Sequence, residues 1–352
     1  MTVLIASDWP TADSSGALLP LHYVLKERPN AVRLMVARRC EPGLLDRALP
    51  KGLRGTWTRR ARAAAWDSLR RGGPELIVAH RLHTAVQVPR ELRSTSRLIV
   101  QDVISPKIAL TSRVHSTLGH AQRTRYLFLE KIIYRQFGEL VVVSKPEARS
   151  LMALGVPPSK IRVVPNGVDI PVSVWQPPQR SLMKALYFGR LDSTRNQEAI
   201  NLASAILAGV RGRSGLDVSL VVVGRGQAPK RLASLDNVEI VGEVEDLLGV
   251  ARQCDFMLNP QTPAAGVKNS VLACMALGMP CIVSAAVAEG LGLAGSDALA
   301  ISDDAVGYGS RIARLLEAPS EAVRMGEAAR ALASSRFSWS AYADAVTSPL
   351  VA

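Results

Sequence analysis

Two arginines that follow a short apolar run are the residues of this chain best suited to bind a negatively charged group. Residues 185–188 read Ala-Leu-Tyr-Phe, which predicts a buried strand, and Gly189, Arg190 and Arg195 come after it. Ligands of open α/β sheets bind beyond the carboxyl ends of the strands. Two cations placed there could stabilise the charge of a departing phosphate group without a metal ion. Two solvated surface arginines are the alternative, and the position at a strand end favours the binding site.

A second segment, residues 265–284, places backbone amides where an anion could bind. A loop of small and polar residues leads into an apolar helix, Gly-Met-Pro at 278–280 ends that helix, and 281–284 read as a short buried strand. The start of such a helix presents N–H groups that have no partner within the helix. Lys268 could add a phosphate contact, or it could lie in solvent. We expect binding mainly through the backbone of the loop residues Gly266, Val267, Lys268, Asn269 and Ser270.

The elements that must position these residues are alternating apolar runs and helical stretches. The apolar runs are residues 3–6, 33–36, 76–79, 98–100 and 140–143 in the first half, and 185–188, 219–223, 238–241, 256–258 and 281–284 in the second. Continuous apolar strands separated by helices indicate parallel sheets that are covered on both faces. Between the two series, the proline-rich residues 171–178 indicate a linker between two domains.

The composition is that of a folded protein with an excess of positive charge. A chain of 352 residues is long enough for two domains, and 48% hydrophobic with 21% charged residues excludes a disordered or fibrous protein. The formal net charge of +13 favours a negatively charged partner, which could be a nucleotide, a phospholipid surface or nucleic acid. The bias of a GC-rich genome toward arginine and alanine is an alternative source of this excess.

Several absences in the sequence favour a metal-independent protein of the reducing cytoplasm. The cysteines, Cys40, Cys254, Cys274 and Cys281, show no C-x-x-C spacing, and two of them lie in apolar runs typical of buried thiols. The first ten residues lack the basic start of a signal peptide, and no apolar run reaches the ~20 residues that cross a bilayer. No Asp-x-Asp motif or His/Cys cluster suggests a metal site, and we expect no cofactor.

Residues 265–284 resemble the donor-binding segment of the GT-B glycosyltransferases, in particular of the retaining glycosyltransferase family 4 (group 1 type). That family has a small-residue loop followed by Leu-Glu-Ala-Met-Ala-x-Gly-x-Pro-Val-Val. This chain keeps Leu272, Met275, Ala276, Gly278 and Pro280. Family members carry two glutamates, one on the sugar and one on the ribose, and the matching positions here are Ala265 and Ala273. Each missing carboxylate removes a charged hydrogen bond worth about 1.5–3 kcal/mol. The donor is therefore held otherwise, the donor is unusual, or the site has decayed.

Other positions carry the same resemblance. Gly189 and Arg190 match the family's Gly-Arg-Leu signature, and Arg195 stands where its Lys-Asn signature usually has lysine. Gly224 matches the family's Val-Gly-x-Gly turn, and Gly16 is the one match to its glycine-rich first loop. Asp102 resembles its strand-end Asp/His position beside the transferred sugar. The resemblance implies that Asp102, Arg190 and Arg195 are catalytic. It also implies that the donor is bound by Gly16, Gly189, Arg190, Arg195, Gly224 and the loop residues 266–270. A helix cap is the alternative role of Asp102.

The resemblance implies the GT-B architecture, an α/β fold in which two Rossmann-like domains face each other across a cleft. We expect an acceptor-binding domain over residues 1–168, a nucleotide-sugar-binding domain over 169–335, and a C-terminal helix within 336–352 that returns to the first domain. The implied reaction moves a sugar from a nucleotide-diphosphate donor, with retention of configuration, to a lipid-linked glycan or a secondary metabolite.

The sequence leaves rival interpretations open. Loss of both glutamates favours, as the alternative, a pseudo-glycosyltransferase or a non-catalytic partner subunit. Nucleic-acid binding rests on the charge alone, and 5% aromatic residues provide few platforms for base stacking. We expect a cytoplasmic protein. Residues 57–71, a basic stretch with Trp57 and Trp66, would add peripheral contact with the inner face of an anionic membrane. An ordinary helix with Trp66 and Leu69 packed inward is the alternative.

Overall fold

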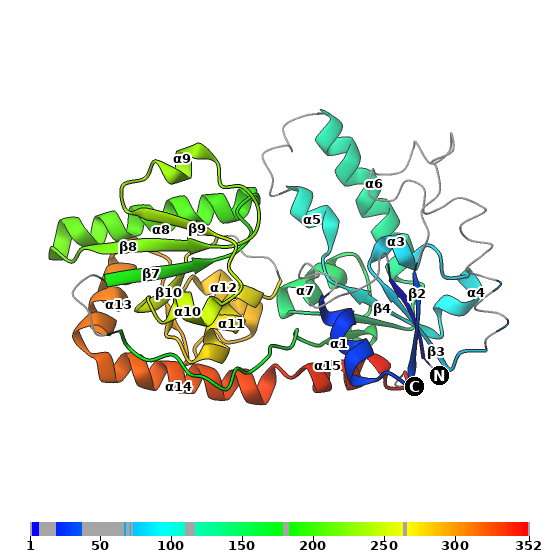
Figure 1. Ribbon diagram of the computed structural model, residues 1–352. Helices are drawn as coiled ribbons and strands as arrows, with labels where there is room; N and C mark the ends of the chain where they lie inside the picture. Colours follow the sequence, from blue (N-terminus) through cyan, green and yellow to red (C-terminus); the bar gives the residue numbers. More distant parts are fainter. Residues whose placement is uncertain are drawn as a thin grey trace. The chain divides into compact units, whose positions relative to one another are not determined.

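The computed structural model describes residues 2–6, 19–36, 67, 71, 73–109, 117–178, 183–262 and 266–350. The chain divides into two compact units (Figure 1). Unit 1 comprises Met1–Gly167 and Trp339–Ala352, and unit 2 comprises Val168–Ser338. Gly16, Ala265 and the basic stretch 57–71, apart from Asp67 and Arg71, lie outside the described residues.

Unit 1 is built on a parallel sheet, which among the described residues has six strands in the order β2-β1-β3-β4-β5-β6. The strands are β1 (Thr2–Ala6), β2 (Val32–Val36), β3 (Leu76–His80), β4 (Ser96–Val100), β5 (Glu139–Val142) and β6 (Ile161–Val163). The helices are α1 (Leu19–Glu27), α3 (Leu82–Ala85), α4 (Arg90–Arg93), α5 (Ile104–Ala109), α6 (Thr117–Tyr134), α7 (Lys145–Ala153) and α15 (Trp339–Thr347). Strands β3 and β4 are buried over their whole length, as expected for a sheet covered on both faces.

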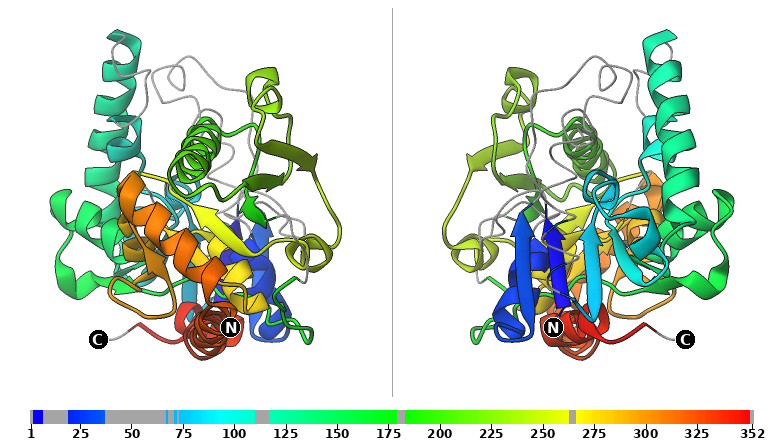
Figure 2. Two further views of the ribbon diagram at one scale, coloured as in Figure 1. Left: turned by 90° about the vertical axis from the view of Figure 1, so that its left-hand side faces the viewer. Right: turned by 90° about the vertical axis from the view of Figure 1, so that its right-hand side faces the viewer.

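Alternate residues of these strands point into two apolar clusters on opposite faces of the sheet. One cluster contains the C-terminal helix α15, which packs beside α1 (Figure 2). The rings of Tyr23 and Trp339 stack there with centroids 4.2 Å apart. The segment after α15 is fixed by the buried Arg97 of β4, which forms an ion pair with Glu139 and donates a hydrogen bond to the carbonyl of Ser348 at 2.8 Å. The last part of the chain is therefore an integral part of unit 1.

Unit 2 holds a second parallel sheet, whose described residues form six strands in the order β12-β11-β10-β7-β8-β9. The strands are β7 (Met183–Phe188), β8 (Val218–Val223), β9 (Val238–Gly242), β10 (Phe256–Asn259), β11 (Cys281–Val283) and β12 (Ala300–Ile301). The helices are α8 (Thr194–Ser214), α9 (Lys230–Ala233), α10 (Leu247–Ala251), α11 (Asn269–Leu277), α12 (Ala285–Leu291), α13 (Ala305–Glu317) and α14 (Pro319–Arg336). From β7 the chain first adds strands on one side and then, from β10, on the other. Such a switch point is where open α/β sheets bind ligands.

The proline-rich residues 171–178, predicted to be a linker, belong to unit 2. Trp175 is buried; its backbone N–H donates to the carbonyl of Leu277 at 2.8 Å, and its indole N–H donates to that of Cys254 at 2.9 Å. A side chain anchored in this way makes the segment part of the core. Among the described residues, no helix combines the length and the apolar character needed to span a membrane.

Candidate functional site

The turn after β7 is held by the turn after the neighbouring strand β8. Gly189 donates its N–H to the carbonyl of Val223 at 3.0 Å, and Leu191 donates to that of Arg225 at 2.7 Å. Gly224 has φ +152°, and a Cβ atom there would lie 1.8 Å from the carbonyl oxygen of Gly189. Two of the predicted donor-binding glycines are thus in direct backbone contact. Only glycine at 224 allows this approach.

Arg190 lies on this turn, with an exposed side chain held by Asp192. The guanidinium donates two hydrogen bonds to the carboxylate: Nε to Oδ1 at 3.0 Å and Nη2 to Oδ2 at 2.6 Å. This hydrogen bonding by Arg190 keeps the pKa of Asp192 below its usual value. Asp192 was not predicted to be a site residue, although a carboxylate two positions after a candidate phosphate ligand is visible in the sequence.

Arg195 is brought to the same turn by the first turn of α8. Its neighbour Asn196 donates Nδ2–H to the carbonyl of Arg190 at 2.9 Å. Arg195 itself is half-buried. The helix therefore fixes the backbone of the Arg190 turn, and both predicted cations belong to one local structure at the carboxyl end of β7.

A network of uncharged polar side chains joins this turn to the end of β10. The backbone carbonyl of Arg190 can only accept a hydrogen bond, so the amide of Asn196 is oriented with its Nδ2 toward that carbonyl. Oδ1 of Asn196 then accepts from the hydroxyl of Tyr187 at 3.2 Å and from Nε2 of Gln261 at 3.5 Å. The hydroxyl of Ser284, which follows β11, donates to the backbone carbonyl of Gln261 at 2.7 Å. Asn196 belongs to the segment that resembles the Lys-Asn signature, but none of these polar residues was predicted to be a site residue.

The loop before α11 follows β10, so it starts at the same edge of the sheet as the Arg190 turn. Gly266 has φ +64°, and a Cβ atom on Gly290 of α12 would lie 2.5 Å from its carbonyl oxygen. Lys268 occupies the N-cap position of α11 without a side-chain capping hydrogen bond. The N-cap side chain therefore does not accept a hydrogen bond from the first backbone N–H groups of this helix. Such a helix start suits binding of an anion. Val267, Lys268, Asn269 and Ser270 are all half-buried.

Ala273, at one of the missing glutamate positions, is half-buried on the fifth residue of α11. The helix ends as predicted, with Gly278 in the left-handed conformation after Leu277. Two of the predicted thiols, Cys274 and Cys281, are buried without a disulfide, and burial raises the pKa of each. They belong to the packing beneath the loop.

Asp102, the predicted catalytic carboxylate, belongs to unit 1. It follows β4, and its side chain is exposed. Two buried glutamates accept hydrogen bonds from the backbone N–H groups of the next residues. Glu147 accepts from Val103 at 2.9 Å, and Glu130 accepts from Ile104 at 2.6 Å and from Ser105 at 3.1 Å. Burial raises the pKa of Glu130. Neither glutamate was predicted to have a special role.

The structure thus brings together the predicted residues of unit 2 at one edge of a sheet. Within the residues it describes, no group of His, Cys, Asp or Glu side chains could hold a metal ion. The arrangement offers two arginines, tight glycine turns and a helix start whose N-cap residue makes no side-chain capping hydrogen bond. Together these features suit the binding of an anionic group such as a diphosphate.

Comparison with known families gives matches over both units. Residues 183–318 match the family described as "Glycosyl transferases group 1", and residues 25–171 match the "Glycosyltransferase Family 4". A comparison with curated proteins gives no significant match. The two matched families support a glycosyltransferase.

Solved structures of similar fold cover nearly the whole chain. Anabaena HepE in complex with UDP has a TM-score of 0.70 and 15% sequence identity, with 98% of both chains covered. Sucrose-phosphate synthase from Thermosynechococcus elongatus has a TM-score of 0.69 and 15% identity, with 97% of this chain and 96% of that chain covered. WaaG, a glycosyltransferase involved in lipopolysaccharide biosynthesis, has a TM-score of 0.66 and 13% identity, with 99% and 100% covered. With the two parallel sheets, these similarities confirm the α/β GT-B fold predicted from the sequence.

Proposed function

We propose that this GT-B glycosyltransferase transfers a sugar from a nucleotide-diphosphate donor bound by unit 2 to an acceptor, with retention of configuration at the anomeric carbon. The matches of both units to glycosyltransferase families support the class of reaction. The finer parts of the proposal, namely the residues, the stereochemistry and the acceptor, rest on the geometry of the site and on the resemblance of its motifs.

The observation that carries the proposal is the convergence of cations and tight turns at the switch point of the unit 2 sheet. Arg190 and Arg195 lie at the end of β7, and the loop before α11 starts from the adjacent β10. A leaving nucleoside diphosphate gains negative charge as the glycosidic bond breaks. Guanidinium groups and backbone N–H groups aimed at that charge lower the barrier because they are already in place before the reaction.

We assign roles to the residues accordingly. Arg190 and Arg195 bind the diphosphate. Arg190 first breaks its ion pair with Asp192 and then pairs with the phosphate. The amides of residues 266–270 add uncharged donors, and Gly189 and Gly224 keep the strand end free of side chains, so that a ligand can approach the backbone. Val267 and Lys268 line the approach to the helix start.

Retention is proposed from the resemblance of the site motifs to a retaining family, and the lack of an obvious nucleophile at the donor site favours a front-face reaction. In a front-face reaction, the acceptor oxygen forms its bond to the anomeric carbon on the side from which the diphosphate departs. The acceptor hydroxyl passes its proton to an oxygen of the departing phosphate, so no protein base is required. Asp102 of unit 1 would orient the acceptor hydroxyl.

The test is a titration followed by a product analysis. Calorimetric titration with UDP, GDP and ADP should show binding of at least one of them; UDP is included because HepE has been solved with it. The matching nucleotide sugar is then incubated with a panel of lipid-linked and soluble acceptors. Proton NMR of the new glycosidic linkage should show the anomeric configuration of the donor. An inverted anomer would refute retention, and no binding of any nucleotide would refute the proposed function as a whole.

A non-catalytic GT-B subunit is a second candidate, favoured by alanine at both positions, 265 and 273, where the family has glutamate. It predicts that no nucleotide sugar releases its diphosphate under any condition. Release that starts only when a second protein is added would indicate an enzyme that needs a partner. The same assay therefore separates the two functions.

A further inference from the structure

Helix α6 of unit 1 carries large apolar side chains on the face that it turns away from the sheet. Leu127 is 40% exposed, Phe128 65% and Ile132 40%. The opposite face of the same helix is fixed in the core through Tyr126, Ile133 and Tyr134, which are all buried. Because the inner face is occupied, no small rotation of the helix could bury the outer one.

The exposed charges of α6 and α7 all have one sign. Helix α6 and the neighbouring α7 contain a single carboxylate each, Glu130 and Glu147, and both are buried as acceptors for the start of α5. The exposed charged side chains of the two helices are Arg123, Arg125, Lys131, Lys145 and Arg149. Since their carboxylates point inward, these helices present only positive charge to the solvent.

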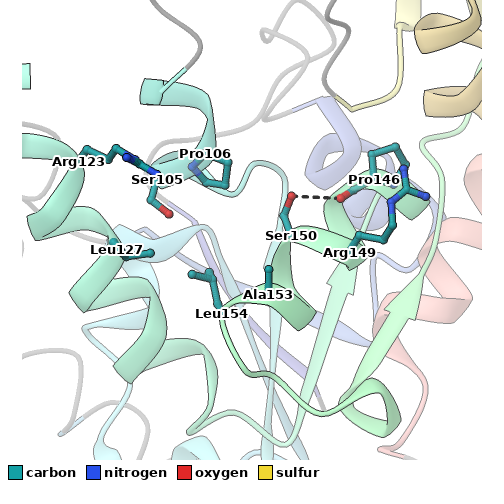
Figure 3. A pocket seen from close by; sticks show the side chains of 9 residues that line it. All are labelled: Ser105, Pro106, Arg123, Leu127, Pro146, Arg149, Ser150, Ala153 and Leu154. Atoms are coloured by element: carbon teal, nitrogen blue, oxygen red, sulfur yellow. Dashed lines mark hydrogen bonds between the residues drawn. The ribbon is translucent and has the colours of Figure 1, made fainter. Parts of the chain in front are cut away.

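An apolar groove adjoins the outer face (Figure 3). It has a volume of about 440 Å³ and lies among residues of α5, α6 and α7. Pro106, Leu127, Ala153 and Leu154 give it apolar walls, with Arg123 and Arg149 also lining it. Leu127 belongs both to the groove and to the exposed face, so the two features form one continuous apolar surface that cations surround.

We propose that the outer face of α6, formed by Arg125, Leu127, Phe128, Lys131 and Ile132, is the surface through which this protein docks on an anionic lipid bilayer. A helix of 18 residues lying in the interface plane is about 27 Å long, at ~1.5 Å per residue. Its apolar side chains enter the acyl boundary, and the long Arg and Lys side chains extend to the lipid phosphates. The adjoining groove gives space to part of a lipid chain.

The exposed residue types favour lipid over nucleic acid. Binding to single-stranded nucleic acid uses several aromatic rings on which bases stack, whereas this face offers one phenyl ring and two aliphatic side chains. Aliphatic groups gain nothing from a phosphate backbone, but they gain from acyl chains. Lipid docking through α6 of unit 1 is independent of the donor site proposed for unit 2.

Sedimentation with vesicles of phosphatidylcholine alone, and of phosphatidylcholine and phosphatidylglycerol in equal amounts, tests the proposal. Wild-type protein should bind the anionic vesicles, with binding that falls as salt rises. The Arg125→Gln, Lys131→Gln double variant should partition about 30-fold less, since each basic residue near an anionic surface contributes about fivefold. The Phe128→Ser, Ile132→Ser variant should lose more than about tenfold, although it keeps every charge.

Matched controls come from unit 2. Leu202 of α8 is 44% exposed and Val306 of α13 is 67% exposed, so Leu202→Ser, Val306→Ser removes a similar apolar area from another unit. Arg252→Gln, Lys230→Gln removes two exposed cations. Both control variants should sediment like the wild type. A thermal melt and a UDP titration show whether each variant is folded and whether its donor site is intact.

Several results would overturn the proposal. One is unchanged vesicle binding in both α6 variants. Another is loss of binding only in Arg59→Gln, Arg60→Gln, Arg62→Gln, which would place the contact in the basic stretch 57–71. A third is the absence of any difference between neutral and anionic vesicles. Salt-sensitive binding to polyuridylate that competes with vesicles and survives in the Phe128→Ser, Ile132→Ser variant would indicate a nucleic-acid surface instead.

Discussion

Arg190 and Asp192 form a two-point ion pair at the carboxyl end of the first strand of unit 2, with Nε–Oδ1 and Nη2–Oδ2 distances of 3.0 and 2.6 Å. The arginine proposed to bind the diphosphate is therefore already paired with an anion of its own chain. Both side chains are exposed, so water screens the pair and a ligand with more charge can replace the carboxylate. If Arg190 binds the diphosphate as proposed, Asp192 competes with the phosphate group for Arg190.

The first prediction concerns this competition. Asp192→Asn should tighten the binding of a nucleoside diphosphate, because Arg190 then has no ion pair to break before it binds the phosphate. Calorimetric titration of the two proteins with UDP measures the difference. Glu321→Gln is the matched control, since it releases Arg314 from a similar exposed pair between α13 and α14. A tighter complex in both variants would point to net charge alone.

The second prediction concerns the two cations. Arg190→Ala and Arg195→Ala should each weaken nucleoside-diphosphate binding by about 1.5–3 kcal/mol, the range for a charge-assisted hydrogen bond. Arg314→Ala removes one charge from another part of unit 2 and should leave the affinity unchanged. Unaltered affinity in both site variants of a folded protein would exclude the proposed phosphate contacts.

The third prediction concerns the glycine contact beneath the site. Gly224→Ala places a Cβ atom 1.8 Å from the carbonyl oxygen of Gly189, so the turn must move, at a cost of at least about 1–3 kcal/mol. Urea unfolding should show this loss together with weaker UDP binding. Gly212→Ala is the control, because a Cβ atom there meets nothing within 4 Å on helix α8. It should stabilise the protein by roughly 0.5–1 kcal/mol.

The fourth prediction concerns the missing carboxylates. With alanine at 265 and 273, a 2′-deoxy or 3′-deoxy nucleotide donor should be accepted nearly as well as the ribonucleotide. A site built to bond a hydroxyl discriminates strongly against its loss. Steady-state kinetics with the paired donors measures the ratio. Strong rejection of the deoxy donors would mean that another polar group has replaced the glutamates. Ala273→Glu should restore a preference for the ribonucleotide.

The fifth prediction concerns Glu130, whose burial raises its pKa above the ordinary value of a glutamate. The folded protein therefore binds this proton more tightly than the unfolded chain does. Its contribution to stability falls as pH rises from ~4.3, the value for an exposed glutamate, to the raised pKa, and is constant above it. Glu130→Gln removes this dependence and also destabilises the protein by about 1–3 kcal/mol, because an amide N–H₂ then faces a backbone N–H.

Thermal unfolding of wild type and Glu130→Gln over a pH series gives the comparison. The stability of the wild type relative to the variant should decrease as pH rises and then level off. Glu317→Gln, at an exposed position at the end of α13, should follow the wild type at every pH. A difference that grows with pH would contradict the assignment, because it would mean that the pKa of Glu130 is lowered.

The parts of the fold that the sequence predicted are those written in local patterns. The runs at 140–143 and 220–223 are continuous and apolar, and each belongs to a buried strand because the sheets are covered on both faces. Glycine at 224 and 278 marked a turn and a helix end that only glycine forms without strain. These signals need no knowledge of the tertiary structure.

The parts that escaped prediction depend on contacts between distant residues. Asn196 and Gln261 meet across 65 positions, and Glu130 reaches the start of α5 from 25 positions away. A glutamate inside a helical pattern is read as a solvated side chain, and only the packing of α5 against α6 turns it inward. Asp192 can be seen in the sequence, but the sequence does not show that its side chain forms an ion pair with Arg190. A carboxylate near an arginine is common on any protein surface.

The packing of α15 against α1 also determines the order in which the protein can be completed during synthesis. The ribosome makes residues 1–167 first, yet their core lacks Trp339, Tyr342 and Val346 until the chain has passed through the whole of unit 2. Unit 2, a contiguous stretch, can close as soon as it emerges. Unit 1 therefore begins first and finishes last. Until then the apolar surface around Tyr23 lacks Trp339, and Arg97 has its ion pair with Glu139 but not the carbonyl of Ser348.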